Sequence, residues 1–129
     1  MERVLIFNPE GDREPSKRKI VFGNPTNIME LNNVKYQWAF DLYKTMGFTN
    51  FWIPEEIPML EDKKQYERLL SEHERRAYEL VLSFLIALDS YQVNMLKEFA
   101  RYLTAPELVM AITSQEFQEA LHSYSYQFI

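Results

Sequence analysis

The chain has 129 residues, enough for one domain or part of one. Hydrophobic residues make up 47% and aromatic residues 15% of it, which excludes a disordered chain, and three glycines and six prolines argue against a turn-rich all-β fold. The absence of cysteine excludes disulfides, thiolate metal sites and thiol catalysis. The formal net charge of -5 gives no reason to expect nucleic acid or an anionic membrane as a partner.

The sequence has no pattern typical of a membrane anchor or a signal peptide. The longest apolar stretch, Leu80–Leu88, is far shorter than the ~20 residues that span a bilayer. Acidic residues surround the very short apolar core at the start of the chain, unlike a signal peptide. We therefore expect a soluble cytoplasmic protein.

An irregular N-terminal arm is expected at residues 1–32. Val4–Phe7 has the pattern of a short strand, which the turn sequence that follows would end. The basic run 17–19 has no aromatic residues interleaved with it, so we interpret it as a solvated loop rather than a nucleic-acid site.

A first helix is expected from about Asn33 to Met46, with Gly47 just after its end. The next residues, up to Leu60, include two prolines that preclude a long helix. Trp52, in this irregular stretch, is either a buried anchor or a redox relay, and its sequence context alone favours the anchor.

Two long helices are expected in the second half of the chain. Ser71 and Glu74 form a capping box that begins one, through about Leu103, and 104–107 resembles a second capping box that begins another, running to Ile129. Long helices with a short connection are typical of antiparallel neighbours in a bundle. The sequence therefore predicts an all-α helical bundle.

Glu119 and His122 are candidate metal ligands on the last helix. At 100° per residue, His122 lies ~60° and Tyr126 ~20° round the helix from Glu119, so the three share one face. A carboxylate and an imidazole at this spacing are the local motif of di-iron and di-manganese bundles. By itself, the spacing is more often an exposed pair of side chains.

Asp89 strengthens the metal interpretation. It lies on one helical stripe with apolar residues, namely Leu82, Leu85, Ile86, Val93 and Leu96. Burying an ionised carboxylate without a partner is costly, so a cation, an arginine or a helix N-terminus is expected beside it. Glu98 lies ~180° from Asp89 and is expected to be solvated, and Glu116, ~120° from His122, is a poorer co-ligand than Glu119.

Tyr126 lies one turn after His122, close to any metal that this histidine binds. Tyr124 points ~140° away from Glu119, which makes it the weaker candidate for redox chemistry. On spacing alone, the two tyrosines are more often core aromatic residues than redox residues. His73 falls in the first turn of a helix and is expected at the surface.

Three stretches of the chain resemble the small, radical-bearing subunit of class I ribonucleotide reductase. They are KYQWAFDLYKTMGFTNFWIPEEI at 35–57, SEHERRAYELVLSFLIALDSYQ at 71–92 and FQEALHSYSYQFI at 117–129. The resemblance extends over residues 28–129. It implies a ferritin-like helical bundle with a dinuclear iron or manganese centre, whose oxidising equivalent passes to a large catalytic subunit that reduces ribonucleotides.

The resemblance also implies roles for individual residues. Asp89, Glu119 and His122 would be metal ligands at the first site, and Glu119 could bridge both metals. Tyr126 would be the residue that becomes a tyrosyl radical, and Trp52 would belong to the electron-transfer path near the metal. The resemblance does not distinguish iron from manganese.

The chain departs from the family's pattern because three further ligands are missing. The family needs another Glu and a second Glu-x-x-His on later helices, and this chain has neither that motif nor the tail that docks on the large subunit. The chain therefore resembles the N-terminal part of the subunit, an incomplete bundle over residues 1–129.

Three explanations of the missing ligands remain open. The subunit can be made in two pieces, from a split gene or around an intein, with the C-terminal remainder supplying them. The chain can be a truncation. Alternatively, two copies can pair into a six-ligand site, which would make a ferritin-like storage or oxidase protein completed by homodimerisation.

Overall fold

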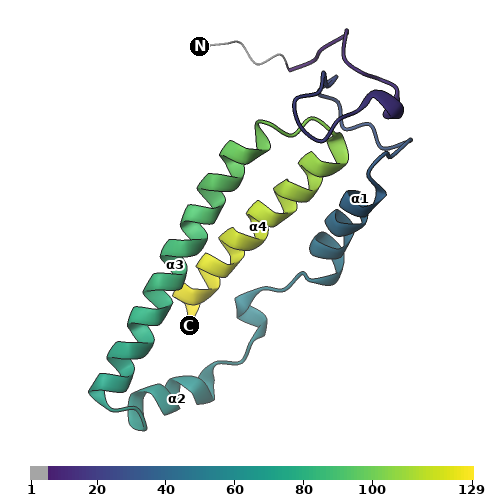
Figure 1. Cartoon of the computed structure of the whole chain (residues 1–129). Coiled ribbons are helices and arrows are strands. Elements are labelled where there is room, and N and C mark those ends of the chain that lie inside the picture. The colour runs from purple at the N-terminus through teal and green to yellow at the C-terminus, as the bar shows by residue number, and fades with distance from the viewer. Residues whose placement is uncertain (1–5) are drawn as a thin grey trace.

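The computed structural model describes residues 6–129, which form helices joined by irregular segments (Figure 1). The helices are α1 (Gln37–Lys44), α2 (Leu60–Arg68), α3 (Glu72–Ala100) and α4 (Pro106–Phe128), with short helical turns η1 (Pro15–Lys17), η2 (Thr45–Thr49) and η3 (Pro54–Glu56). Within residues 6–129 no strand forms, and a single bridge joins Val21 to Leu103. The all-α prediction is confirmed. The strand expected at Val4–Phe7 lies partly outside the described residues, and its last two residues are irregular.

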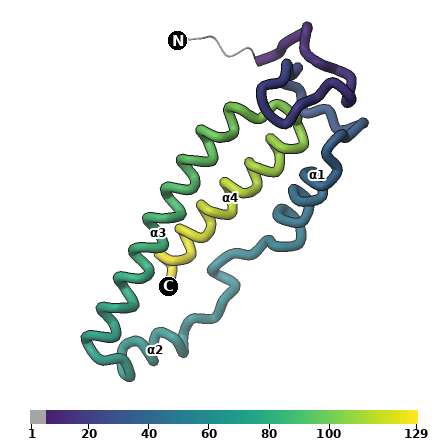
Figure 2. The backbone as a smooth tube through the Cα atoms, viewed as in Figure 1, coloured from purple at the N-terminus to yellow at the C-terminus, as the bar shows by residue number. Residues whose placement is uncertain are grey.

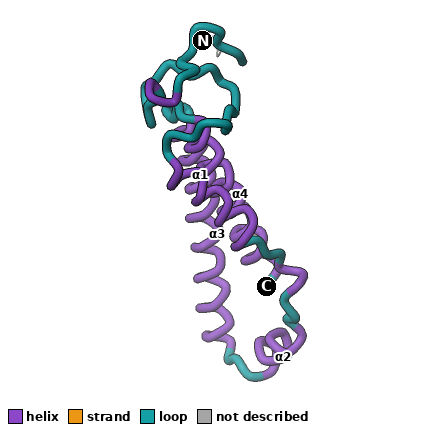
Figure 3. The backbone as a smooth tube through the Cα atoms, turned by 90° about the vertical axis from the view of Figure 1, so that its right-hand side faces the viewer, coloured by secondary structure: helices purple, strands orange, loops and turns teal. Residues whose placement is uncertain are grey.

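Helix α4 is the central element of the fold. It packs antiparallel to α3 on one side and against α1 on the other (Figures 1 and 2). The irregular arm covers the end of the bundle where α3 turns into α4, and α2 lies at the opposite end (Figure 3). No helix in the part of the chain that the structure describes is long and apolar enough to cross a membrane.

The start of α3 follows the local sequence. The Ser71 hydroxyl accepts a hydrogen bond from the Glu74 amide at 3.3 Å, and the Glu74 carboxylate accepts one from the Ser71 amide at 2.8 Å. The predicted capping box is confirmed, because both of its partners lie within one turn and need no tertiary contact.

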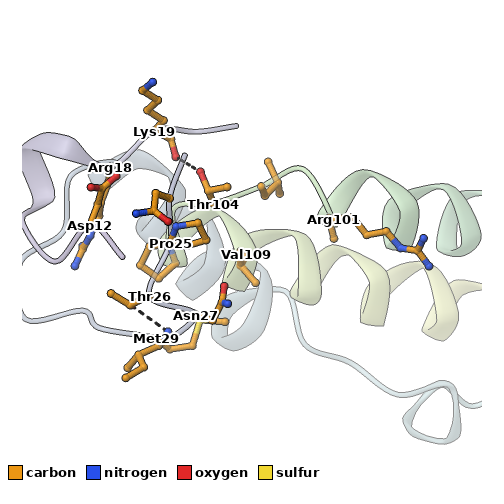
Figure 4. A pocket seen from close by; sticks show the side chains of 15 residues that line it. Asp12, Arg18, Lys19, Pro25, Thr26, Asn27, Met29, Arg101, Thr104 and Val109 are labelled. Atoms are coloured by element: carbon orange, nitrogen blue, oxygen red, sulfur yellow. Dashed lines mark hydrogen bonds between the residues drawn. The ribbon is translucent and has the colours of Figure 1, made fainter. Parts of the chain in front are cut away.

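The capping box predicted at residues 104–107 is wrong. The Thr104 hydroxyl instead donates to the Lys19 carbonyl at 2.8 Å, a bond drawn in Figure 4, and accepts from the Gly23 amide at 3.1 Å. Ala105 takes the N-cap position without a side-chain hydrogen bond, and Pro106 begins the helix. Thr104 thus ties the arm to the α3–α4 turn.

Glu107 stabilises a different helix from the one that contains it. Its side chain is fully buried, and one carboxylate oxygen accepts from the amides of Lys35, at 3.0 Å, and Tyr36, at 2.8 Å. These amides precede α1, which begins at Gln37 without a capping side chain of its own, not near Asn33 as expected. A carboxylate from α4 therefore satisfies the two N–H groups immediately before α1.

The end of α1 and the basic run of the arm also differ from expectation. Gly47 does not cap α1 with a positive φ, because the backbone continues into the π-helical turn η2. Arg18 is only 6% exposed, and its guanidinium donates to the Asn33 carbonyl at 2.8 Å and pairs with Glu30 at 3.5 Å. Arg18 is therefore part of the packing of the arm rather than of a solvated loop.

A cavity of about 260 Å³ lies between the arm and the α3–α4 turn. Figure 4 shows that the charged ends of Lys19 and Arg101, which line it, point away from the other lining side chains. These two cations therefore do not converge on the cavity.

Replacing Glu107 by alanine should lower the free energy of unfolding of the assembled protein by about 2–3 kcal/mol. The change removes charge-assisted hydrogen bonds to two amides and leaves those amides without partners. Chemical denaturation measures the effect. Glu98→Ala, at a side chain that is 65% exposed, is the matched control and should change the free energy by less than about 0.5 kcal/mol. Equal effects of the two substitutions would contradict the role of Glu107.

Candidate metal centre

Asp89 lies on the face of α3 that packs against α4. The apolar residues on the same face are buried or half-buried, namely Leu82, Leu85, Ile86, Val93 and Leu96. Asp89 itself is 7% exposed, and its Oδ2 atom is buried without a hydrogen-bond partner in the part of the chain that the structure describes. Since burying a carboxylate oxygen without a partner is costly, a cation beside this oxygen would stabilise it.

Glu119 and His122 lie one turn apart on α4, facing Asp89. Their side chains are 12% and 40% exposed, and the Nδ1 atom of His122 is 3.4 Å from Oε2 of Glu119. One ligand atom from each of Asp89, Glu119 and His122 lies within 4.8 Å of the other two. The structure therefore brings together the three residues that the sequence singled out as metal ligands.

The three side chains fit a divalent metal ion. With bonds of ~2.0–2.2 Å, two ligands of one metal are at most ~4.4 Å apart, so the observed spacing requires only a small closure. Two carboxylate oxygens and one imidazole nitrogen suit hard to borderline first-row transition metals. The unpartnered oxygen of Asp89 distinguishes this group from an exposed pair of charges, which would have no reason to include a buried carboxylate from another helix.

Other acidic residues and the second histidine lie away from this group. The Glu98 side chain is 65% exposed and pairs with Arg101 at 3.1 Å, which confirms that it is solvated. Glu116 is not among the three residues that converge. His73 is exposed at the start of α3, as expected.

Trp52 packs against the histidine of the group. The centroids of the Trp52 and His122 rings are 6.2 Å apart, and the rings are inclined by only 27°. Trp52 is half-buried, so it is not the fully buried anchor that its sequence context alone favoured. The stacking holds an indole directly beside a candidate metal ligand.

Tyr126 is half-buried on α4, one turn after His122. Within residues 6–129 its side chain forms no hydrogen bond and no ring contact with Asp89, Glu119 or His122. Its proximity to the metal group stays a prediction from helical spacing.

Tyr124 and Glu55 form a contact that sequence reasoning did not find. The exposed Tyr124 hydroxyl donates a hydrogen bond to the Glu55 carboxylate. This bond raises the pKa of Tyr124 and lowers the pKa of Glu55, because the ionised carboxylate stabilises the protonated phenol and the phenol stabilises the ionised carboxylate. The two residues are 69 positions apart, so no local pattern could have indicated the pair.

Known proteins resemble this chain along nearly its whole length. It is 78% identical over 127 residues to a ribonucleoside-diphosphate reductase subunit beta of Aquifex aeolicus, covering 98% of this chain and 18% of that protein. It is 46% identical to the subunit beta of Treponema pallidum, covering all of this chain and 36% of that protein. The chain thus spans well under half the length of these relatives.

A solved structure agrees with these sequence matches. The ribonucleotide reductase R2 subunit from Clostridium botulinum superposes with a TM-score of 0.85 at 44% identity, covering 99% of this chain and 39% of that one. The family model described as "Ribonucleotide reductase, small chain" matches residues 28–129, which include both long helices and the three candidate ligands. The chain therefore belongs to the ribonucleotide reductase small-chain family.

Proposed function

We propose that residues 1–129 are the N-terminal part of a ferritin-like di-metal domain, in the radical-generating small subunit of a ribonucleotide reductase. One observation carries the proposal. Asp89 from α3 meets Glu119 and His122 from α4, while one of its oxygens is buried without a hydrogen-bond partner among residues 6–129. The relatives named as ribonucleoside-diphosphate reductase subunit beta support the same assignment.

In this proposal Asp89, Glu119 and His122 hold one metal of a dinuclear iron or manganese centre, with Glu119 able to bridge to the second metal. When bound, the centre supplies the oxidising power that removes an electron from a tyrosine. The apolar neighbours of Asp89 on α3 keep water away from its carboxylate, which would strengthen its attraction to a cation.

Tyr126 is the proposed radical residue, which gives up an electron and its phenolic proton. Its half-buried position on α4, one helical turn after His122, supports this assignment. Trp52 is the proposed electron-transfer residue, supported by its stacking on His122. The radical then supports reduction of ribonucleotides to deoxyribonucleotides by a large catalytic subunit.

The outer face of α3 supports the proposal that further helices complete the bundle. Large apolar side chains are exposed at spacings of three or four residues, on a different face of α3 from Asp89: Val81, Phe84, Leu88, Tyr91, Met95 and Phe99. An exposed stripe of this length is typical of a surface that packs on other helices. We propose the C-terminal remainder of the subunit as the first partner, within a homodimer of the complete small subunit.

Reconstitution tests the proposed function. This chain, assembled with the remainder of the subunit, metal and the large subunit, should support reduction of a ribonucleoside diphosphate, and omitting the chain should abolish the reaction. Metal analysis of the assembly should give two metals per subunit. A homodimer of this chain alone that binds two metals and oxidises iron without supporting reduction would instead favour the ferritin-like storage or oxidase protein.

A further inference from the structure

The segment between η2 and α2 runs beside the C-terminal half of α4 and contacts it at three points (Figures 1 and 3). The Phe51 ring stacks on Phe117, with centroids 6.4 Å apart. The Trp52 ring stacks on His122, and the Glu55 carboxylate accepts the hydrogen bond from Tyr124. The metal group proposed above therefore has an outer layer formed by this segment.

We propose that Glu55 and Tyr124 are a positioning pair, whose hydrogen bond holds the Trp52 indole against the His122 imidazole and so restricts the orientation of that metal ligand. The proposal rests on the proposed function for the role of His122. Neither Glu55 nor Tyr124 touches the metal group itself, so both would act through Trp52.

The backbone links each member of the pair rigidly to one member of the ring stack. Tyr124 follows His122 by two residues on the same helix, α4. Glu55 follows Trp52 by three residues, through a 3-10 turn that begins at the fully buried Pro54. The fixed φ of proline and the hydrogen bond from the Ile57 amide to the Pro54 carbonyl, at 3.0 Å, stiffen this turn. A shift of Glu55 is therefore transmitted to Trp52.

No closed core could hold Trp52 in place instead. Pro54 is the single buried residue between Phe51 and Ile57, and Phe51 and Phe117 are themselves 57% and 54% exposed. A hydrogen bond to an ionised carboxylate is stronger and more directional than such ring contacts. The Glu55–Tyr124 bond is thus the directional tether of the segment to α4.

The stacking of Trp52 on His122 matters because a metal-binding histidine must direct one particular ring nitrogen toward the metal. Its Nδ1 atom faces Glu119 at 3.4 Å, and turning the imidazole about its Cβ–Cγ bond would carry this atom away. An indole lying nearly parallel to the imidazole hinders that turn. Outer-shell partners that orient a metal-ligating histidine typically change metal affinity 10–100-fold, so loss of this more remote tether should weaken affinity by about tenfold or less.

Fluorine NMR of the assembled, metal-free protein labelled with 5-fluorotryptophan tests the positioning directly. The Trp52 resonance is assigned by its loss in Trp52→Phe. Tyr124→Phe, which removes the hydroxyl and keeps the ring, should shift and broaden this resonance. Tyr66→Phe is the matched control, because it removes the same kind of bond, from the half-buried Tyr66 to Glu79, at the opposite end of α3 from the arm. It should leave the Trp52 resonance in place.

Two substitutions at Glu55 separate positioning from a general loss of structure. Glu55→Gln retains a carbonyl oxygen that can accept from Tyr124, so it should restore both the resonance and the Mn²⁺ affinity that Glu55→Ala loses. An unchanged Trp52 resonance in Tyr124→Phe and Glu55→Ala, or an equal shift in Tyr66→Phe, would overturn the positioning role. Because the NMR is done without metal, its outcome is independent of whether Asp89 proves to be a metal ligand.

Discussion

Asp89→Asn is expected to weaken metal binding by the assembled protein more than about a hundredfold, beyond the effect of outer-shell partners, because it neutralises a ligand. The same substitution should leave the metal-free protein as stable as before, or more stable. Oδ2 of Asp89 is buried without a hydrogen-bond partner in residues 6–129, and asparagine replaces this carboxylate by a neutral group of the same shape, which costs less to bury. A change that weakens binding and does not weaken folding distinguishes a ligand from a structural residue.

Equilibrium dialysis against Mn²⁺ and chemical denaturation of the metal-free protein measure the two effects. Glu98→Gln is the matched control on α3, since the Glu98 side chain is 65% exposed. This substitution should change neither the Mn²⁺ affinity nor the free energy of unfolding. If Asp89→Asn destabilises the metal-free protein and leaves metal affinity intact, Asp89 has a protein partner instead and the metal assignment fails.

Tyr126→Phe should abolish the tyrosyl EPR signal of the reconstituted, oxidised protein while the bound metal remains at the level of the unsubstituted protein. The phenol is the group that would lose an electron and a proton, whereas a phenyl ring of the same shape has no such proton to lose. Because Tyr126 is half-buried, the substitution should also preserve the packing of α4. EPR spectroscopy and metal analysis of the same sample provide both readouts.

Tyr102→Phe is the control for the radical assignment. Tyr102 is 52% exposed at the far end of the bundle, where its ring packs edge-on against Phe22, a contact that phenylalanine retains. Its substitution should leave the EPR signal unchanged. A signal that persists in Tyr126→Phe would refute the assignment, and its disappearance in Tyr124→Phe would transfer the radical to that residue.

Features of the fold that depend on a few neighbouring residues could be predicted from the sequence. The capping box at Ser71 and Glu74 formed as expected, because its donors and acceptors are within one turn. The periodicity of α3 correctly placed Asp89 on a buried apolar face. Helical spacing likewise placed Glu119 and His122 on one face, since a helix of 3.6 residues per turn fixes that relation wherever the helix lies.

Features that depend on competition between distant groups could not be predicted. Thr104 and Glu107 have the spacing of a capping box, yet the hydroxyl binds the arm and the carboxylate binds the amides before α1. Arg18 looked solvated and is buried, because carbonyl and carboxylate acceptors from the arm surround it. Local propensity is worth little compared with a satisfied buried hydrogen bond, so the tertiary partner determines which bond forms.

The candidate metal centre depends both on local helical geometry and on tertiary packing. The sequence by itself determined the three ligand types and the face of the helix on which each lies. Asp89 is about 17 Å before the end of α3 and Glu119 about 20 Å after the start of α4, at 1.5 Å per residue. Only the antiparallel packing of the two helices brings Asp89 and Glu119, which lie at similar distances from the α3–α4 turn, next to each other. Only the path of the chain after α1 brings Trp52 and Glu55 against α4. Helical periodicity is a local property, whereas the register between helices depends on side chains that meet only in the folded protein.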